Sequence, residues 1–216
     1  MKRNKYVFGT IIMVVLVTLN ITSCSKDDIK GENGSSFPPK KTIVIETKSY
    51  ETWTYFSFEK GVIGTYKEGE FNYKNNTTWD IAFHRWDIRT NSGESGIGKG
   101  GAFLTNYGGD LKVDMWSTMP SKGEFITDAS IKTYMAIPNM NSEDGADQRV
   151  IVPANTILAK WLTVVMTSIP PKYALLNKAF VVRTANGKHA AISFTNYMND
   201  KAVKGYVNFD YIYPLD

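Results

Sequence analysis

The chain has 216 residues, of which 25 are Lys or Arg, 21 are Asp or Glu and 43% are hydrophobic. This length is sufficient for one domain with a sizeable hydrophobic core. The formal net charge of +4 falls to about +1 when the N-terminal segment described next, which holds three basic residues, is removed. So small a net charge gives no reason to expect a nucleic-acid partner.

The N-terminal residues have the features of a signal peptide. A basic start, Met1–Lys5, precedes a short apolar run from Ile11 to Leu19. This run is shorter than the roughly 20 residues that a helix needs to cross a membrane, so we expect residues 1–23 to be a cleaved signal peptide. The only cysteine, Cys24, follows small residues as in a lipoprotein cleavage site and cannot form an intrachain disulfide. We therefore predict that Cys24 is acylated and that the lipid is the membrane attachment.

Residues 24–40 are predicted to form a flexible tether. The segment from Gly31 onward is rich in Gly, Ser, Pro and Lys, and such a composition cannot bury enough apolar surface to offset the entropy of ordering. Ser25–Asp28 is similar to the acidic export signals of surface-displayed lipoproteins, although a solvated linker is the alternative. We expect the protein on the surface of the outer membrane, from which it could also be released.

From residue 41 onward, short runs of β-branched and aromatic residues alternate with turns. The predicted strands are Thr42–Thr47, Trp53–Phe58, Trp79–Arg89, Ile131–Tyr134, Leu162–Met166, Ala179–Thr184, Ala190–Phe194 and Tyr206–Tyr213. No apolar stripe with helical period exceeds about two turns. The sequence therefore predicts that residues 41–216 form a single antiparallel all-β domain.

Two of these segments show clear local patterns. Ala179–Phe194 is predicted to be a hairpin, because its strands flank Asn186-Gly187, a dipeptide suited to a type I′ turn. The last strand alternates Val207, Phe209 and Tyr211 with more polar residues, which indicates a sheet with one packed face.

A glycine-rich stretch follows the strand predicted at Trp79–Arg89. It is not a phosphate-binding loop, because Gly100 stands where a hydroxyl would be needed for Mg²⁺ and no helix start follows. A dinucleotide-binding motif is also excluded, because the βαβ context is missing. We expect these glycines to serve turns.

Five separated stretches carry a resemblance to a known family. They are Tyr50–Phe58, Trp79–Phe103, Trp161-Leu162, Phe180–Arg183 and Tyr211–Pro214. Together they resemble the HmuY family of haem-binding lipoproteins. The resemblance implies an all-β domain whose loops form a haem cleft. It also implies a haemophore-like binding protein, not an enzyme, that passes haem to a TonB-dependent outer-membrane receptor.

The resemblance also implies two axial ligands to the haem iron, one in a loop after a central strand and one shortly beyond a Trp-Leu pair. Met166 stands at the second position, and Met140 is the nearest match at the first, with Met135 as the alternative. This is similar to family members in which methionines replace histidines. Thioether sulfur favours reduced iron more than imidazole does, but methionine is also a common core filler.

The chain contains only two histidines, His84 and His189, too few for a three-histidine zinc site. His84 lies in a motif that does not supply the haem ligand in the resembling family. We expect His84 to be a structural, hydrogen-bonded residue and His189 to be exposed.

The predicted surroundings of the ligands suit a flat apolar molecule. Tyr134 and Trp161 are expected to contact the porphyrin face. Lys160 and Lys172 are candidates for reaching the propionates, but the sequence assigns neither. Host haemoproteins are a conceivable source of haem. Two other functions stay open, namely an adhesin or glycan-binding lipoprotein on the same scaffold, and a carrier of another tetrapyrrole whose methionines only pack.

Overall fold

The computed structural model describes residues 38–111, 124–139, 147–165, 168 and 170–215. Antiparallel strands dominate this part of the chain, which confirms the predicted all-β class. The strands are β1 (Lys41–Glu46), β2 (Thr52–Ser57), β3 (Gly61–Lys67), β4 (Ile81–His84), β5 (Asp87–Thr90), β6 (Gly101–Gly108), β7 (Ala129–Thr133), β8 (Val150–Ala154), β9 (Leu162–Val165), β10 (Lys172–Leu175), β11 (Lys178–Arg183), β12 (His189–Met198) and β13 (Lys204–Ile212). Short 3₁₀ helices are η1 (Tyr73–Asn75), η2 (Gly93–Ser95) and η4 (Leu158–Trp161), and no described helix is long and apolar enough to cross a membrane.

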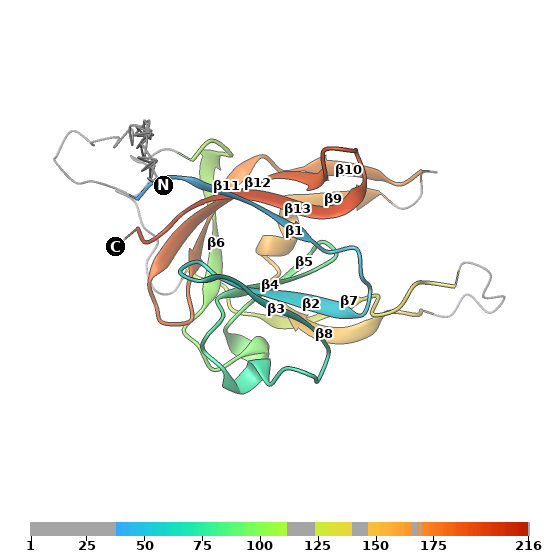
Figure 1. Cartoon of the computed structure of the whole chain (residues 1–216), viewed down its shortest axis with the longest axis horizontal. Helices are drawn as coiled ribbons and strands as arrows, with labels where there is room; N and C mark the ends of the chain where they lie inside the picture. The colour runs from blue at the N-terminus through green and yellow to red at the C-terminus, as the bar shows by residue number, and fades with distance from the viewer. Residues whose placement is uncertain (1–37, 112–123, 140–146, 166–167, 169, 216) are drawn as a thin grey trace, which may run out of the picture.

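Two antiparallel sheets enclose the main core. One has the strand order β1-β13-β12-β11-β6 and the other β3-β2-β4-β5, and they form the upper and lower layers of Figure 1. Val207, Phe209 and Tyr211 on β13 are buried, while the residues between them are half-buried. Phe209 stacks on Phe83 of the opposite sheet, with ring centroids 5.4 Å apart. The alternation predicted for the last strand therefore builds the core between the layers.

Several connections gather at one end of the molecule, on the right of Figure 1. The β1–β2, β4–β5 and β12–β13 connections lie there. Two separate ribbons, β7–β8 and β9–β10, also project toward this end. Each ribbon is an antiparallel pair, joined by the segment that follows Thr133 in one case and Val165 in the other. These are the two segments in which the axial ligands were predicted.

The glycine-rich stretch packs closely around Asn91, which is fully buried. The Asn91 side-chain amide donates to the carbonyl oxygens of Asn76 and Trp79, and its Oδ1 accepts from the Gly98 N–H at 3.0 Å. A Cβ added at Gly98 would lie 2.7 Å from the Asn91 carbonyl oxygen, and one at Gly100 would lie 2.6 Å from the same atom. These glycines are needed for close approach of backbone to backbone, which goes beyond the turn role expected from the sequence.

A buried carboxylate, Asp128, joins the same region to the β7–β8 ribbon. Its side chain accepts hydrogen bonds from the backbone N–H and hydroxyl of Thr90, from Ser95 Oγ at 2.6 Å and from Asn155 Nδ2 at 3.0 Å. Asp128 is only 3% exposed. Burial raises the pKa of this carboxyl to about 6, because the loss of water outweighs the effect of the four hydrogen bonds.

The prediction of one strand over Trp79–Arg89 was wrong. The segment contains two strands, β4 and β5, which pair with His84 opposite Asp87 around a two-residue turn. Arg85 in this turn has φ 51°. Neither Arg85 nor Trp86 is a residue that usually signals a hairpin turn, so the sequence pattern read as continuous.

The hairpin over Ala179–Phe194 is present as β11 and β12, but its turn is not of type I′. Only Gly187 has positive φ, at 93°, whereas a type I′ turn needs two such residues. The Thr184 N–H donates to the Lys188 carbonyl oxygen at 2.8 Å, which leaves a three-residue loop. The predicted signal peptide of residues 1–23, Cys24 and the tether up to residue 37 lie outside the described residues.

Candidate functional site

The predicted ligands Met140 and Met166 lie outside the described residues, each in the segment that joins the two strands of one ribbon. The structure does describe how each segment begins. Tyr134 and Met135 directly follow β7, and η4 leads from Trp161 into β9, which ends at Val165. Both ribbons project toward the same end of the molecule, one in the upper and one in the lower layer of Figure 1.

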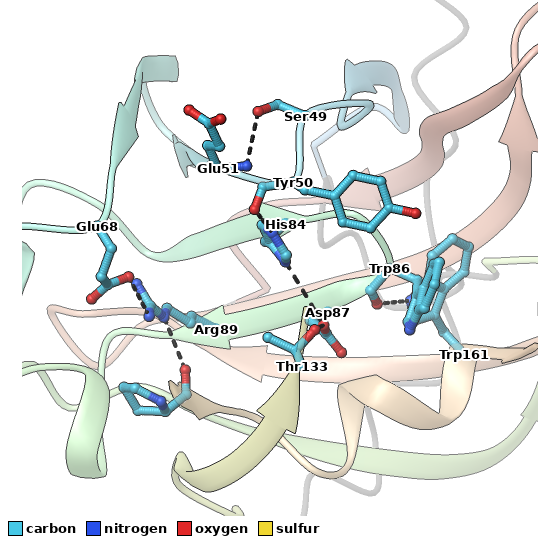
Figure 2. Close-up of polar contacts among 11 residues, drawn as sticks. Ser49, Tyr50, Glu51, Glu68, His84, Trp86, Asp87, Arg89, Thr133 and Trp161 are labelled. Carbon is cyan, nitrogen blue, oxygen red and sulfur yellow. Dashed lines mark hydrogen bonds and ion pairs between the residues drawn. The ribbon is translucent and has the colours of Figure 1, made fainter. Parts of the chain in front are cut away.

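The β4–β5 hairpin is bonded to the end of β7 and to the residue that precedes β9, as Figure 2 shows. The Thr133 hydroxyl at the end of β7 donates to the Asp87 carboxylate. The Trp161 indole N–H just before β9 donates to the Trp86 carbonyl oxygen at 2.8 Å. These bonds therefore hold the end of β7, where the first segment begins, and the start of β9, at the base of the second ribbon.

Trp161 is part of the core in this structure. It is 1% exposed, and its ring lies 4.6 Å from that of Phe194 and 5.8 Å from that of Tyr197. Contact between Trp161 and haem stays a prediction. Its observed contacts hold the start of β9 against the five-stranded sheet.

The first segment begins with Tyr134 and Met135. Tyr134 is half-buried, as is Met135. Met135 packs against a cluster of buried residues that contains Trp53, Tyr55 and Trp79 together with aliphatic residues of β8. A flexible thioether often fills such an aromatic cluster and gains favourable sulfur–ring contacts. The position of Met135 is thus accounted for by packing.

The two histidines have different environments. His84 is fully buried, with Nε2 2.9 Å from the Tyr50 carbonyl oxygen and its ring stacked on Trp53 at 5.0 Å. This agrees with the expected structural, hydrogen-bonded role. His189 was expected to be exposed, but it is half-buried and its ring lies 5.4 Å from that of Phe125. The expectation failed because the start of β12, just after the hairpin turn, packs against Phe125, which is far away in the sequence.

Aromatic residues and two cations meet beside the β9–β10 ribbon. The Arg85 guanidinium lies 4.3 Å from the centre of the Tyr50 ring and 5.7 Å from that of Trp86. The Lys204 ammonium lies 4.3 Å from the centre of the Tyr173 ring. Neither Arg85 nor Lys204 was predicted from the sequence. The only available signal was an arginine next to an aromatic residue in Phe83–Asp87.

Tyr197 closes this group from β12. Its ring lies 5.5 Å from that of Tyr173 and 6.2 Å from that of Trp86. Burial raises the pKa of Tyr197 to about 12, an effect that the positive charge of Arg85 opposes. The phenol is therefore neutral at physiological pH. The group beside the β9–β10 ribbon consists of uncharged aromatic rings and the two cations Arg85 and Lys204.

Comparison with known proteins connects this arrangement to a family. A family model described as HmuY protein matches residues 49–211. The chain is 31% identical to a solved structure of a proposed HmuY-like haem-binding protein from Bacteroides vulgatus, with 82% of this chain and 93% of that chain covered and a TM-score of 0.66. No curated protein matches the chain.

Two further solved structures are similar. A proposed lipoprotein from Bacteroides fragilis is 29% identical, with 81% of this chain and 91% of that chain covered and a TM-score of 0.65. The apo HmuY analog of Tannerella forsythia is 27% identical, with 81% and 95% covered and a TM-score of 0.60. Because the family model spans most of the domain, from the β1–β2 connection to β13, the chain belongs to the HmuY family.

Proposed function

We propose that this protein is a haemophore-like surface lipoprotein that binds haem non-covalently and passes it to a TonB-dependent outer-membrane haem receptor. The observation that carries the proposal is membership of the HmuY family, together with 31% identity over 82% of the chain to a structure named as an HmuY-like haem-binding protein. The protein acts as a carrier and not as an enzyme, with host haemoproteins as a source of the haem.

Met140 and Met166 are the proposed axial ligands of the iron. The placement of both ribbons at one end of the molecule supports a single ligand held between the two segments (Figure 1). The aromatic packing of Met135 supports Met140 over Met135 in the first segment. Tyr134 is the proposed aromatic neighbour of the porphyrin on the β7 side, and Trp161 is the proposed neighbour on the β9 side.

The scarcity of available imidazole supports sulfur ligation. His84 is buried and bonded to the Tyr50 carbonyl oxygen, and His189 packs beside Phe125. Thioethers are soft, uncharged ligands that carry no proton in the physiological range. Haem bound by Met140 and Met166 should therefore keep its coordination from about pH 7.5 to about pH 5, whereas imidazole, with an ordinary pKa of about 6.5, would compete with protons.

The lipid on Cys24 is the proposed anchor, with residues 24–40 as the tether. Similarity to a proposed lipoprotein from Bacteroides fragilis supports this location. A tethered carrier of this kind would remain close to its receptor while its domain samples the surroundings.

The test is a haem titration of the chain from Ser25 onward, followed by absorption spectroscopy. We expect saturable one-to-one binding and a six-coordinate spectrum. Met140→Ala and Met166→Ala should each lose six-coordination, while Met135→Ala should keep it and lose only stability. His84→Gln serves as the matched control for a buried potential ligand and should leave the iron spectrum unchanged.

Two outcomes would contradict the proposal at different levels. A free-haem spectrum in the wild-type protein would remove haem as the cargo. The wild-type protein could instead bind haem normally, with coordination lost in His84→Gln and retained in Met166→Ala. Haem binding would then stand, and the assignment of the axial ligands would be wrong.

A further inference from the structure

Arg85 occupies a position that does not suit its residue type. It is the first residue of the two-residue β4–β5 turn and has φ 51°. A non-glycine residue with positive φ is strained by about 1 kcal/mol or more, and Asn or Gly is the usual choice in such a hairpin turn. The contacts of the turn or of the arginine side chain must therefore compensate for the strain.

The bonds of the guanidinium leave donors unused. Arg85 Nη1 donates to the Lys48 carbonyl oxygen at 2.8 Å, and the plane of the group packs against Tyr50. Arg85 Nε is buried and has no hydrogen-bond partner among the described residues. No described carboxylate forms an ion pair with Arg85. A guanidinium has five N–H donors, so this one has the capacity to bind an anion.

A second cation lies nearby. Lys204 Nζ donates to the Pro171 carbonyl oxygen at 3.1 Å, just before β10, and lies over the Tyr173 ring. The next residue, Gly205, approaches the guanidinium so closely that an added Cβ would lie 3.5 Å from Arg85 Nη1. Within the described part of the chain, Lys204 has no ion-pair partner either, whereas the neighbouring Lys48 is paired with Glu46 at 2.9 Å.

We infer that Arg85, assisted by Lys204, is the site that binds the carboxylates of the protein's ligand. The inference rests on the proposed function, in which the ligand is haem and the carboxylates are its two propionates. Neither cation has a carboxylate partner among the described residues, so both attract an anionic ligand. The planar guanidinium matches a carboxylate in a bidentate arrangement, and the aromatic walls of Tyr50 and Tyr173 reduce its exposure to water.

This assignment differs from the candidates that the sequence offered. Lys160 and Lys172 flank the β9–β10 ribbon, but both are exposed. An exposed lysine binds an anion weakly, because water competes for both charges. Arg85 is half-buried and held in place by its own turn, so less conformational entropy is lost when a carboxylate binds.

The experiment compares haem with haem dimethyl ester, which has the same iron and porphyrin but no propionate charge. Arg85→Asn is the main variant, because asparagine suits the positive φ of the turn while removing the guanidinium. Lys204→Gln is the second variant. Lys60→Asn, in the exposed β2–β3 turn at the opposite end of the molecule in Figure 1, is the control for loss of one positive charge.

Arg85→Asn should weaken haem binding on the order of tenfold or more, as expected for a charge-assisted bidentate contact, and should leave the affinity for the dimethyl ester nearly unchanged. Lys204→Gln should show the same selectivity with a smaller loss, and Lys60→Asn should affect neither ligand. Equal losses for haem and its ester in both variants, or no loss in either, would overturn the assignment. Failure of the wild-type protein to bind either ligand would instead refute the proposed function, so the two failures can be told apart.

Discussion

Replacing Asp128 by asparagine should change how the stability of the domain depends on pH. The folded-state pKa of this carboxyl is about 6, against an ordinary value of 3.8. At about 1.4 kcal/mol per pKa unit, the difference corresponds to about 3 kcal/mol. Because the folded state binds the proton more tightly than the unfolded state, this contribution is fully present below about pH 4 and is lost as the pH rises through about 6.

The measurement is the free energy of unfolding in urea at pH 7.5, 6 and 4.5, for wild-type protein and Asp128→Asn. Between pH 7.5 and pH 4.5 the wild-type protein should gain about 2 kcal/mol relative to the variant. Other carboxylates, including the buried Asp80, whose pKa is also raised by burial, are common to both proteins and cancel in the comparison. The exposed Asp200→Asn variant is the control and should parallel the wild-type protein.

A constant difference between wild-type protein and Asp128→Asn at all pH values would refute the reasoning. So would a loss of wild-type stability relative to the variant on acidification. The first result would mean that the four hydrogen bonds to Asp128 balance the effect of burial on its pKa, and the second that they outweigh it.

Three further predictions concern packing and location. Gly98→Ala should lower the free energy of unfolding by about 2 kcal/mol, because the added methyl group meets the Asn91 backbone, and urea unfolding measures this. Arg89→Met should lower the free energy of unfolding by about 2 kcal/mol in the same assay. The buried guanidinium lies 3.7 Å from the centre of the Trp53 ring, and its removal leaves the Pro153 carbonyl oxygen and the Tyr55 hydroxyl without their donor. Unchanged stability would show that apolar packing suffices at this position. Cys24→Ala should leave the protein uncleaved or released from the outer membrane, and cell fractionation that still finds a correctly cleaved variant in the membrane would exclude the lipid anchor.

The sequence alone determined the class of the fold because strand formation depends largely on local composition and alternation. The β-branched and aromatic runs at Thr42–Thr47, Trp53–Phe58 and Tyr206–Tyr213 correspond closely to β1, β2 and β13. Family membership could likewise be anticipated, because the five resembling stretches retain residues that the structure places in the core, such as Trp53, Trp161 and Phe180.

Turns were predicted less well because a tertiary contact can override local preference. The positive φ of Arg85 is tolerated because the β4–β5 hairpin is bonded to Thr133 and Trp161. No residue within Trp79–Arg89 indicates a turn at this position. The glycines after Asn91 were recognised as flexible points. Their role in letting the backbone pack around one buried amide depends on Asn76 and Trp79, which precede them by more than ten residues.

For the site, the sequence determined which residue types were available, namely two histidines and a set of methionines. Only the tertiary structure decided what those residues have as neighbours. It placed Met135 among aromatic rings and brought Arg85, Tyr173 and Lys204 together from three distant strands and turns. The physical reason is that propensity and alternation act over a few residues, whereas burial and charge pairing depend on segments that become neighbours only when the sheets and ribbons have packed.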